Sequence, residues 1–270
     1  MKKKISVTID SDVLNEVKLL IDGIKIRNMS QAIESLIRKS TSERRVAVIL
    51  AGGDEDKLKF NGVLKPLVKF KGKTVIERMI ENFRRYNFLD IFLVGRKNTL
   101  SEIFKSLGDG SGFGINLNYV EEKVGKSATT QDSARTLKLL KDKVKTTFIC
   151  SYCDILFNYN LDVVWNFHKG NSAVVTNLLK TTQTPAKWGV VTMNGNQIEK
   201  FSEKPNKTNS NLIYTGIFIS HPDIFNMPGN SLEYDVFPKM ANMGRLAGFI
   251  CSGSSGHIHE KNLKYPVTIK

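Results

Sequence analysis

The chain has 270 residues, of which 41% are hydrophobic, and a formal net charge of +14. This length allows a large buried core and more than one domain. No apolar run approaches the length of a membrane span, and the first residues lack the apolar segment of a signal peptide, so we expect neither an integral membrane protein nor a secreted one. The chain has three cysteines, Cys150, Cys153 and Cys251, and an odd number cannot all be paired in disulfides. This favours reduced thiols in a cytoplasmic protein.

The positive charge is spread along the chain. Residues 1–45 hold ten Lys/Arg and six Asp/Glu, a balance of +4, and the remaining +10 lies beyond them. A basic surface attracts anionic substrates and nucleic acids alike, so the charge does not choose between these partners. A solvated Lys-rich surface with no ligand has the same composition.

The first forty residues predict one strand followed by two helices. Residues 2–9 alternate between apolar and polar side chains, residues 10–12 suit the first turn of a helix ending near residues 22–23, and Ser30 suits the N-cap of a second helix. The apolar positions are Ile5, Val7, Ile9, Val13, Val17, Leu20, Ile21, Ala32, Ile33, Leu36 and Ile37. A unit this small cannot bury its own apolar surface, so it needs a partner.

This strand–helix–helix pattern resembles a ribbon-helix-helix domain. The resemblance implies a homodimer whose paired first strands lie in the DNA major groove. It also implies base contacts from Lys4, Ser6 and Thr8, a backbone contact from Lys2, and a DNA phosphate held by free amides at the start of the second helix, near Ser30. The alternative is a dimerisation arm that touches no DNA.

A short polar connector over residues 40–45 separates this unit from the rest of the chain. Domain boundaries commonly fall in such exposed polar segments. We therefore expect a ribbon-helix-helix domain over residues 1–42 and a larger domain over residues 43–270.

The larger domain opens on a buried strand and a glycine turn. The five apolar residues 46–50, which Ala51 and two glycines follow, are typical of a strand buried on both faces, because a half-buried strand would alternate. Gly52 and Gly53 let the chain turn sharply and leave backbone amides free to face phosphates. Lys65 adds a positive charge, and Pro66 stiffens its segment. The pattern predicts a phosphate-binding loop, with an ordinary tight turn as the alternative.

Strands and helices alternate beyond this loop. Helical spacing predicts helices over residues 75–83, 101–107 and 129–140, and short apolar runs predict strands over residues 91–94, 117–120 and 147–150. Such a series builds an α/β domain with a Rossmann-like, mostly parallel sheet and right-handed crossovers. Ligands of these sheets bind beyond the carboxyl ends of the strands, so Gly52 and Asp154 are expected to share one site.

Several motifs resemble those of the sugar-1-phosphate nucleotidyltransferases, in the order and near the spacing of that family. The opening motif is Leu50-Ala51-Gly52-Gly53 with Leu58 and Lys65-Pro66-Leu67, followed by Cys153-Asp154, Trp188-Gly189-Val190-Val191, Glu203-Lys204-Pro205 and Thr215-Gly216-Ile217-Phe218. Together they span about residues 45 to 265. The resemblance implies an enzyme that joins a nucleoside triphosphate to a hexose 1-phosphate and releases pyrophosphate.

The resemblance also implies which residues carry the chemistry. Lys57, Lys65 and Asp154 would be catalytic, and Asp154 would hold Mg²⁺, with His259 at the position of the second metal ligand. Glu203 would accept sugar hydroxyls, and Lys204 would bind the sugar phosphate. The full implied set of substrate-binding residues is Leu50, Ala51, Gly52, Gly53, Thr129, Gly189, Glu203, Lys204 and Gly216.

The chain departs from the family pattern at three places. Residues 54–57 read Asp-Glu-Asp-Lys where the family has x-Gly-Thr-Arg, so three carboxylates approach the triphosphate and Lys57 replaces a bidentate Arg. The family pattern has a Gly-Thr pair where this chain has Ala128-Thr129. It also has an Asp where this chain has His259, or His257 in a shifted alignment. The altered loop favours an alternative function, a transcription regulator that senses a nucleotide or sugar nucleotide through this domain.

A zinc site is a further alternative for part of this pattern. Cys150 and Cys153 have the spacing of a zinc-binding pair, and His257 and His259 could supply the other two ligands. Cys150 lies in a predicted buried strand, however, where free cysteine is a common core residue. We therefore favour a packing role for the cysteines.

Overall fold

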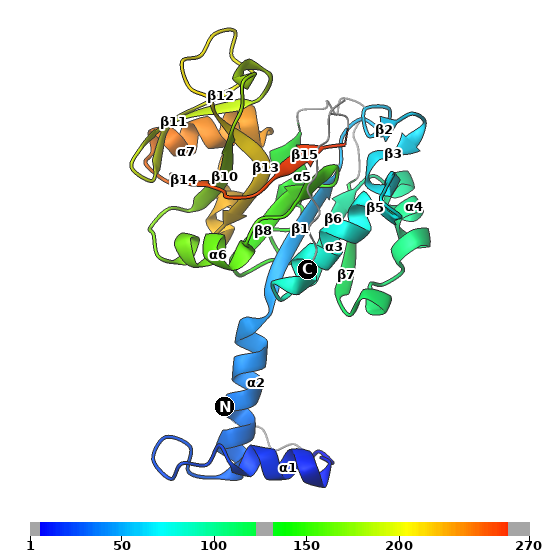
Figure 1. The fold of residues 1–270 in the computed structure, drawn as a ribbon, viewed down its shortest axis with the longest axis vertical. Coiled ribbons are helices and arrows are strands. Elements are labelled where there is room, and N and C mark those ends of the chain that lie inside the picture. The colour runs from blue at the N-terminus through cyan, green and yellow to red at the C-terminus, as the bar shows by residue number, and fades with distance from the viewer. Residues whose placement is uncertain (1–5, 123–131, 259–270) are drawn as a thin grey trace. The chain divides into compact units, whose positions relative to one another are not determined.

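The computed structural model describes residues 6–122 and 132–258. The chain divides into two compact units, Met1–Arg44 and Arg45–Lys270 (Figure 1). None of the described helices is long and apolar enough to cross a membrane.

The small unit contains two helices, α1 (Ser11–Lys18) and α2 (Met29–Glu43). The Asp10 side chain caps α1 as expected and accepts a hydrogen bond from the backbone N–H of Asp12 at 2.9 Å. Residues 6–10 belong to no helix or strand in this single chain, and residues 1–5, with Lys2 and Lys4, lie outside the described residues. The ribbon strand therefore stays a prediction.

Two expectations for α2 are wrong. The N-cap is Asn28 and not Ser30, because the Asn28 side chain accepts from the Gln31 N–H at 3.0 Å and the Gln31 side chain accepts from the Arg27 N–H at 2.7 Å. The helix also continues to Glu43, through most of the expected polar connector. Residues 40–43 contain neither Gly nor Pro, so nothing in them stops a helix that has already started.

The small unit leaves seven large apolar side chains exposed among the residues whose burial is described. Val17 and Ala32 are the buried apolar residues among those whose burial is described in this unit. The exposed ones are Val7, Val13, Leu19, Leu20, Ile24, Leu36 and Ile37, with exposed fractions from 39% to 85%. An apolar surface of this kind commonly marks an interaction site.

A nine-stranded sheet forms the centre of the large unit, in the order β10-β14-β12-β11-β13-β8-β1-β6-β7. Four neighbouring strands run parallel: β8 (Phe148–Tyr152), β1 (Arg45–Ala51), β6 (Phe88–Gly95) and β7 (Asn116–Glu121). The other five are β10 (Val175–Thr181), β11 (Gly189–Asn194), β12 (Gln197–Glu203), β13 (Leu212–Ser220) and β14 (Leu246–Ile250), and most of their pairings are antiparallel.

The expectation of a mostly parallel sheet is therefore wrong, because the sheet is mixed. The strand direction changes where β13 pairs antiparallel with β8. The β11–β12 hairpin contributes to this difference, since strands joined by a two-residue turn must be antiparallel. The alternation of apolar runs and helical spacing predicted the crossovers of the first half, whereas no strand was predicted in the second half.

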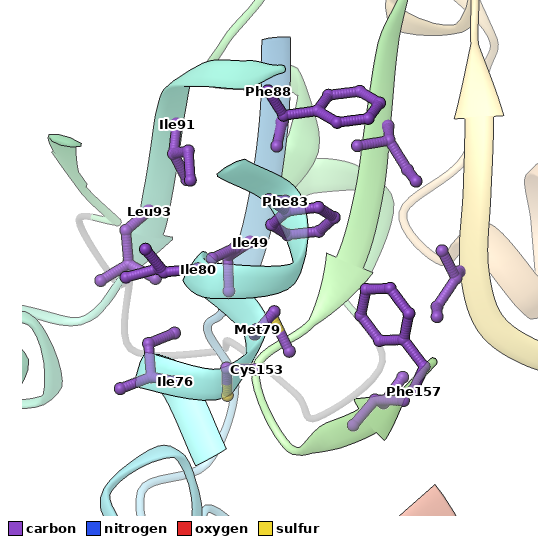
Figure 2. Close-up of a cluster of buried hydrophobic side chains, with 14 of the residues drawn as sticks. Ile49, Ile76, Met79, Ile80, Phe83, Phe88, Ile91, Leu93, Cys153 and Phe157 are labelled. Carbon is purple, nitrogen blue, oxygen red and sulfur yellow. The ribbon is translucent and has the colours of Figure 1, made fainter. Parts of the chain in front are cut away.

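Two hydrophobic cores cover the two faces of the sheet. Ala47, Ile49 and Ala51 belong to one core, whereas Val48 and Leu50 belong to the other. Successive side chains of a strand point to opposite faces, so a strand between two cores is apolar throughout, as predicted for residues 46–50. Figure 2 shows the first core, in which Met79, Ile80 and Phe83 of α3 gather with Ile49, Phe88 and Phe157.

The remaining elements connect and cover this sheet. The helices are α3 (Val75–Arg85), α4 (Lys97–Leu107), α5 (Ser133–Lys138), α6 (Leu161–Lys169) and α7 (Phe237–Asn242). The short strands are β2 (Lys59–Phe60), β3 (Val63–Leu64), β4 (Lys69–Phe70), β5 (Lys73–Thr74), β9 (Ile155–Phe157) and β15 (Ser255–His257). Four 3₁₀ turns, Lys65–Leu67, Ser111–Phe113, Pro185–Lys187 and Pro222–Asn226, and a π-helical turn, η5 (Leu232–Val236), complete the list. The predicted helices and strands of residues 75–120 and 147–150 all have a counterpart here, whereas the helix expected over 129–140 begins at Ser133 among the described residues.

Candidate active site

Two pockets open at the carboxyl end of β8, and Tyr152 lines both. The smaller, which we name the β1-side pocket, has a volume of about 60 Å³ and is lined by Leu50, Gly52, Gly53, Asp132, Ser133, Thr136 and Tyr152. The larger, the β13-side pocket, has about 410 Å³ and is lined by Tyr152, Lys187, Trp188, Gly189, Glu203, Lys204, Tyr214, Gly216, Glu233 and His257. Most residues singled out in the sequence therefore converge on this edge of the sheet.

The glycine turn after β1 is shaped for close packing. A Cβ at Gly52 would lie 2.6 Å from Oε2 of Glu122 and 3.1 Å from Cγ2 of Thr136, so a side chain has no room there. Gly53 has φ +101°, a conformation that other residues rarely adopt. Ala51 is fully buried at the end of β1 and does not line the pocket.

Asp154 follows β8 and lies between two nitrogen groups. Its Oδ2 is 3.4 Å from Nζ of Lys65, and its Oδ1 is 3.4 Å from Nδ1 of His257. All three side chains are at most 16% exposed, so this contact is screened by water far less than a surface ion pair. Strand pairing between β15 and β9 brings His257 opposite Ile155 and so fixes its approach to Asp154.

The Asp154 carboxylate is the group here that could bind Mg²⁺. Mg²⁺ is commonly bound in proteins through one or two carboxylates together with substrate phosphates. Among the described residues there is no group of three or more His, Cys, Asp or Glu side chains that could hold a metal by itself. His259 lies outside the described residues, and His257 is the histidine found beside Asp154. Cys150 and Cys153 are buried, and burial raises the pKa of both thiols, as expected for cysteines that pack in a core.

The β13-side pocket is built on close backbone approaches. Gly189 of β11 faces Glu203 of β12, and a Cβ there would lie 2.9 Å from Oε2 of Glu203. Lys204 has φ +45° and donates its N–H to the Trp188 carbonyl at 3.0 Å. Gly216 has φ +83°, and a Cβ there would lie 2.4 Å from Cδ1 of Ile155. Such a strained, tight lining is typical of a functional site.

Glu203 has a perturbed acidity. Burial, and secondarily the negative charge of Glu233, raise the pKa of the Glu203 carboxyl to about 7, although Lys204, with Nζ 3.7 Å from Oε1, acts in the opposite direction. At neutral pH this carboxyl is therefore close to half protonated, and it can donate as well as accept a hydrogen bond. A pKa shifted toward 7 inside a pocket is a common property of functional groups.

Some predicted site residues lie elsewhere, and some pocket residues were missed. Lys57 is exposed and lines neither pocket, and Thr129 lies outside the described residues. In the small unit Ser6, Thr8 and Ser30 are exposed. The pocket residues to which no site role was assigned from the sequence are Asp132, Ser133, Thr136, Tyr152, Lys187, Trp188, Tyr214 and Glu233. Tyr152 had a usable signal, since it stands at the end of a buried strand just before Asp154.

The fold and its two adjoining pockets define an α/β protein with a glycine turn at one pocket and Glu203, Lys204 and His257 at the other. Residues 46–251 match the family model "Nucleotidyl transferase", and the chain belongs to that family. It is 29% identical over 199 residues to a mannose-1-phosphate guanyltransferase of Yarrowia lipolytica, covering 70% of this chain and 53% of that protein.

Two further comparisons describe the same relationship. A UTP–glucose-1-phosphate uridylyltransferase of Synechocystis is 27% identical over 216 residues, covering 73% of this chain and 55% of that protein. The chain thus spans a little over half the length of these curated relatives. A Bacillus anthracis protein described as a putative glucose-1-phosphate thymidylyltransferase, crystallised with sucrose, has the same fold, with a TM-score of 0.68 at 20% identity over 79% of this chain and 89% of that one.

We expect Gly216→Ala to destabilise the protein more than Gly195→Ala. Both glycines have positive φ, but a Cβ at Gly195 meets nothing within 4 Å, whereas at Gly216 it meets the buried Ile155. The control should lose about 1 kcal/mol of unfolding free energy from backbone strain, and Gly216→Ala about 1–3 kcal/mol more from overpacking. Urea unfolding followed by fluorescence measures both, and equal losses would contradict the tight lining of the pocket.

Proposed function

We propose that this protein joins a nucleoside triphosphate and a hexose 1-phosphate to form a nucleotide sugar and pyrophosphate. The observation that carries the proposal is the pair of adjoining pockets that share Tyr152, next to the Lys65–Asp154–His257 cluster. Family membership and the names of the relatives support this reaction class. The triphosphate would lie against the glycine turn that lines the β1-side pocket, and the sugar phosphate would lie in the β13-side pocket.

In this reaction an oxygen of the sugar phosphate attacks the α-phosphorus, and the bond to the pyrophosphate leaving group breaks. Positioning and charge neutralisation perform such transfers without a side-chain nucleophile. Amides of Gly52 and Gly53 and the Lys65 ammonium would hold the triphosphate, while Glu203 and Lys204 would hold the sugar and its phosphate. Asp154 would bind Mg²⁺, which supplies positive charge to the phosphates when it is present.

Asp154→Asn should lower the rate of pyrophosphate release about a hundredfold or more, because the transferring phosphoryl group loses its charge stabilisation. The assay uses GTP, UTP, dTTP, ATP and CTP with mannose and glucose 1-phosphates. Asp142→Asn is the control, since that side chain is 96% exposed and contacts Lys145 on the surface. A parent chain that binds nucleotide but releases no pyrophosphate with any pair would instead support the sensor function.

We propose further that the small unit pairs with a second copy of this chain, because seven of its large apolar side chains are exposed. Light scattering at micromolar concentration should give the mass of a dimer. Leu36→Glu should shift the protein toward the monomer, whereas Leu139→Glu, at a similarly exposed leucine of the large unit (41% against 39%), should not. A monomeric parent chain, or equal effects of the two variants, would contradict this pairing.

We also propose that the paired small units bind DNA as in ribbon-helix-helix proteins. Selection from random DNA should then enrich two-fold symmetric sites, and Thr8→Ala should change the preferred sequence. Lys2→Ala should weaken binding to all sequences and reduce its salt dependence. If no half-site is enriched, the small unit acts only in dimerisation.

A further inference from the structure

The carboxylate of Glu233 lies at the boundary of the two pockets. It lines the β13-side pocket and accepts hydrogen bonds from two residues of the β1-side pocket, the Tyr152 hydroxyl and Ser133 Oγ, the latter at 2.9 Å. We propose that Glu233 is a positioning residue that couples the two pockets, so that occupation of one raises the affinity of the other. This inference rests on the proposed function for the identity of the two ligands.

Several contacts hold Glu233 and its turn in place. It belongs to the π-helical turn η5, a form that often occurs at functional sites, and Leu232 and Val236 anchor this turn in the core. Oδ2 of Asp235 accepts from the Asn230 and Ser231 N–H groups at 2.8 and 2.9 Å, which closes the preceding loop. The carboxylate can therefore act as a fixed point between two walls of the site.

The contact with Ser133 extends the coupling to the start of α5. Ser133 Oγ donates to Oε2 of Glu233 and accepts from the Leu232 N–H at 2.8 Å, so its orientation is fixed on both sides. The Ala134 N–H donates to the Asn230 carbonyl at 2.7 Å. A shift of η5 must therefore move the first turn of α5, which forms one wall of the β1-side pocket, together with Tyr152.

Charge links Glu233 to the far side of the β13-side pocket. The charged or titratable groups that act on Glu203 are Lys204, Glu233 and Tyr214, and the same pocket contains Tyr152, Lys187 and His257. Burial is the larger cause of the raised pKa of Glu203, and repulsion from the Glu233 carboxylate is the second. A ligand group that donates to both carboxylates would relieve this repulsion and stabilise η5 in its present position.

The test measures coupling by binding, with the full chain and no turnover. The affinity for mannose 1-phosphate and for glucose 1-phosphate is measured calorimetrically with and without the α,β-methylene analogues of GTP and UTP, which cannot transfer their nucleotidyl group. The parent chain should bind one sugar phosphate about fivefold or more tightly in the presence of an analogue. In Glu233→Gln this ratio should fall to about one, and in the control Glu199→Gln, an exposed residue of β12, it should stay at the parent value.

A second readout separates coupling from a merely structural role. Loss of the Glu233 charge should move the pH midpoint of sugar phosphate binding downward by about one pH unit, because the Glu203 proton is held less tightly. Should Glu233→Gln not fold, Tyr152→Phe, which removes only the hydroxyl, should lower the ratio in the same way. A parent ratio of one, or a ratio and midpoint unchanged in the folded variant, would overturn the inference. If the ligands are coupled but no pyrophosphate is released, the proposed reaction is contradicted and this inference stands. If pyrophosphate is released but the ligands are not coupled, this inference is contradicted and the proposed reaction stands.

Discussion

Burial of β1 on both faces is the constraint on which the rest of the large unit depends. Ile49 packs into one core and Val48 and Leu50 into the other, so neither face tolerates a polar side chain. The chain can become polar only where the strand ends, and there it meets Gly52 and Gly53. The β1-side pocket thus lies where the apolar layer stops, as expected for open α/β sheets.

The change of strand direction between β8 and β13 explains why two pockets adjoin. On the β1 side the strands are parallel, so the loops that follow them lie at one edge of the sheet, where their backbone amides can bind phosphates. On the other side, the β11–β12 hairpin and β13 deliver side chains and backbone from within strands, such as Glu203 and Gly216. Tyr152, at the end of β8, belongs to both arrangements.

The sequence allowed prediction of the features that depend on neighbouring residues, such as buried strands and helix caps. Buried runs such as residues 46–50 and capping groups such as Asp10 were predictable because burial and hydrogen bonding act within a few residues. The cap at Asn28 was missed because it depends on two hydrogen bonds of Gln31, which donates its N–H to the Asn28 side chain and accepts from the Arg27 N–H. Glu233 could not be found, since only the tertiary fold brings it to Ser133, a hundred positions away in sequence.

The place of β1 in the middle of the sheet has a consequence for how the chain folds. Val48 pairs with Phe92 on one side and with Cys150 on the other, and the second partner is synthesised much later. Until β8 is synthesised, the edge of β1 that faces it lacks its strand partner. Pairing between segments so distant in sequence slows folding, and the site at the ends of β1 and β8 can form only after this pairing is made.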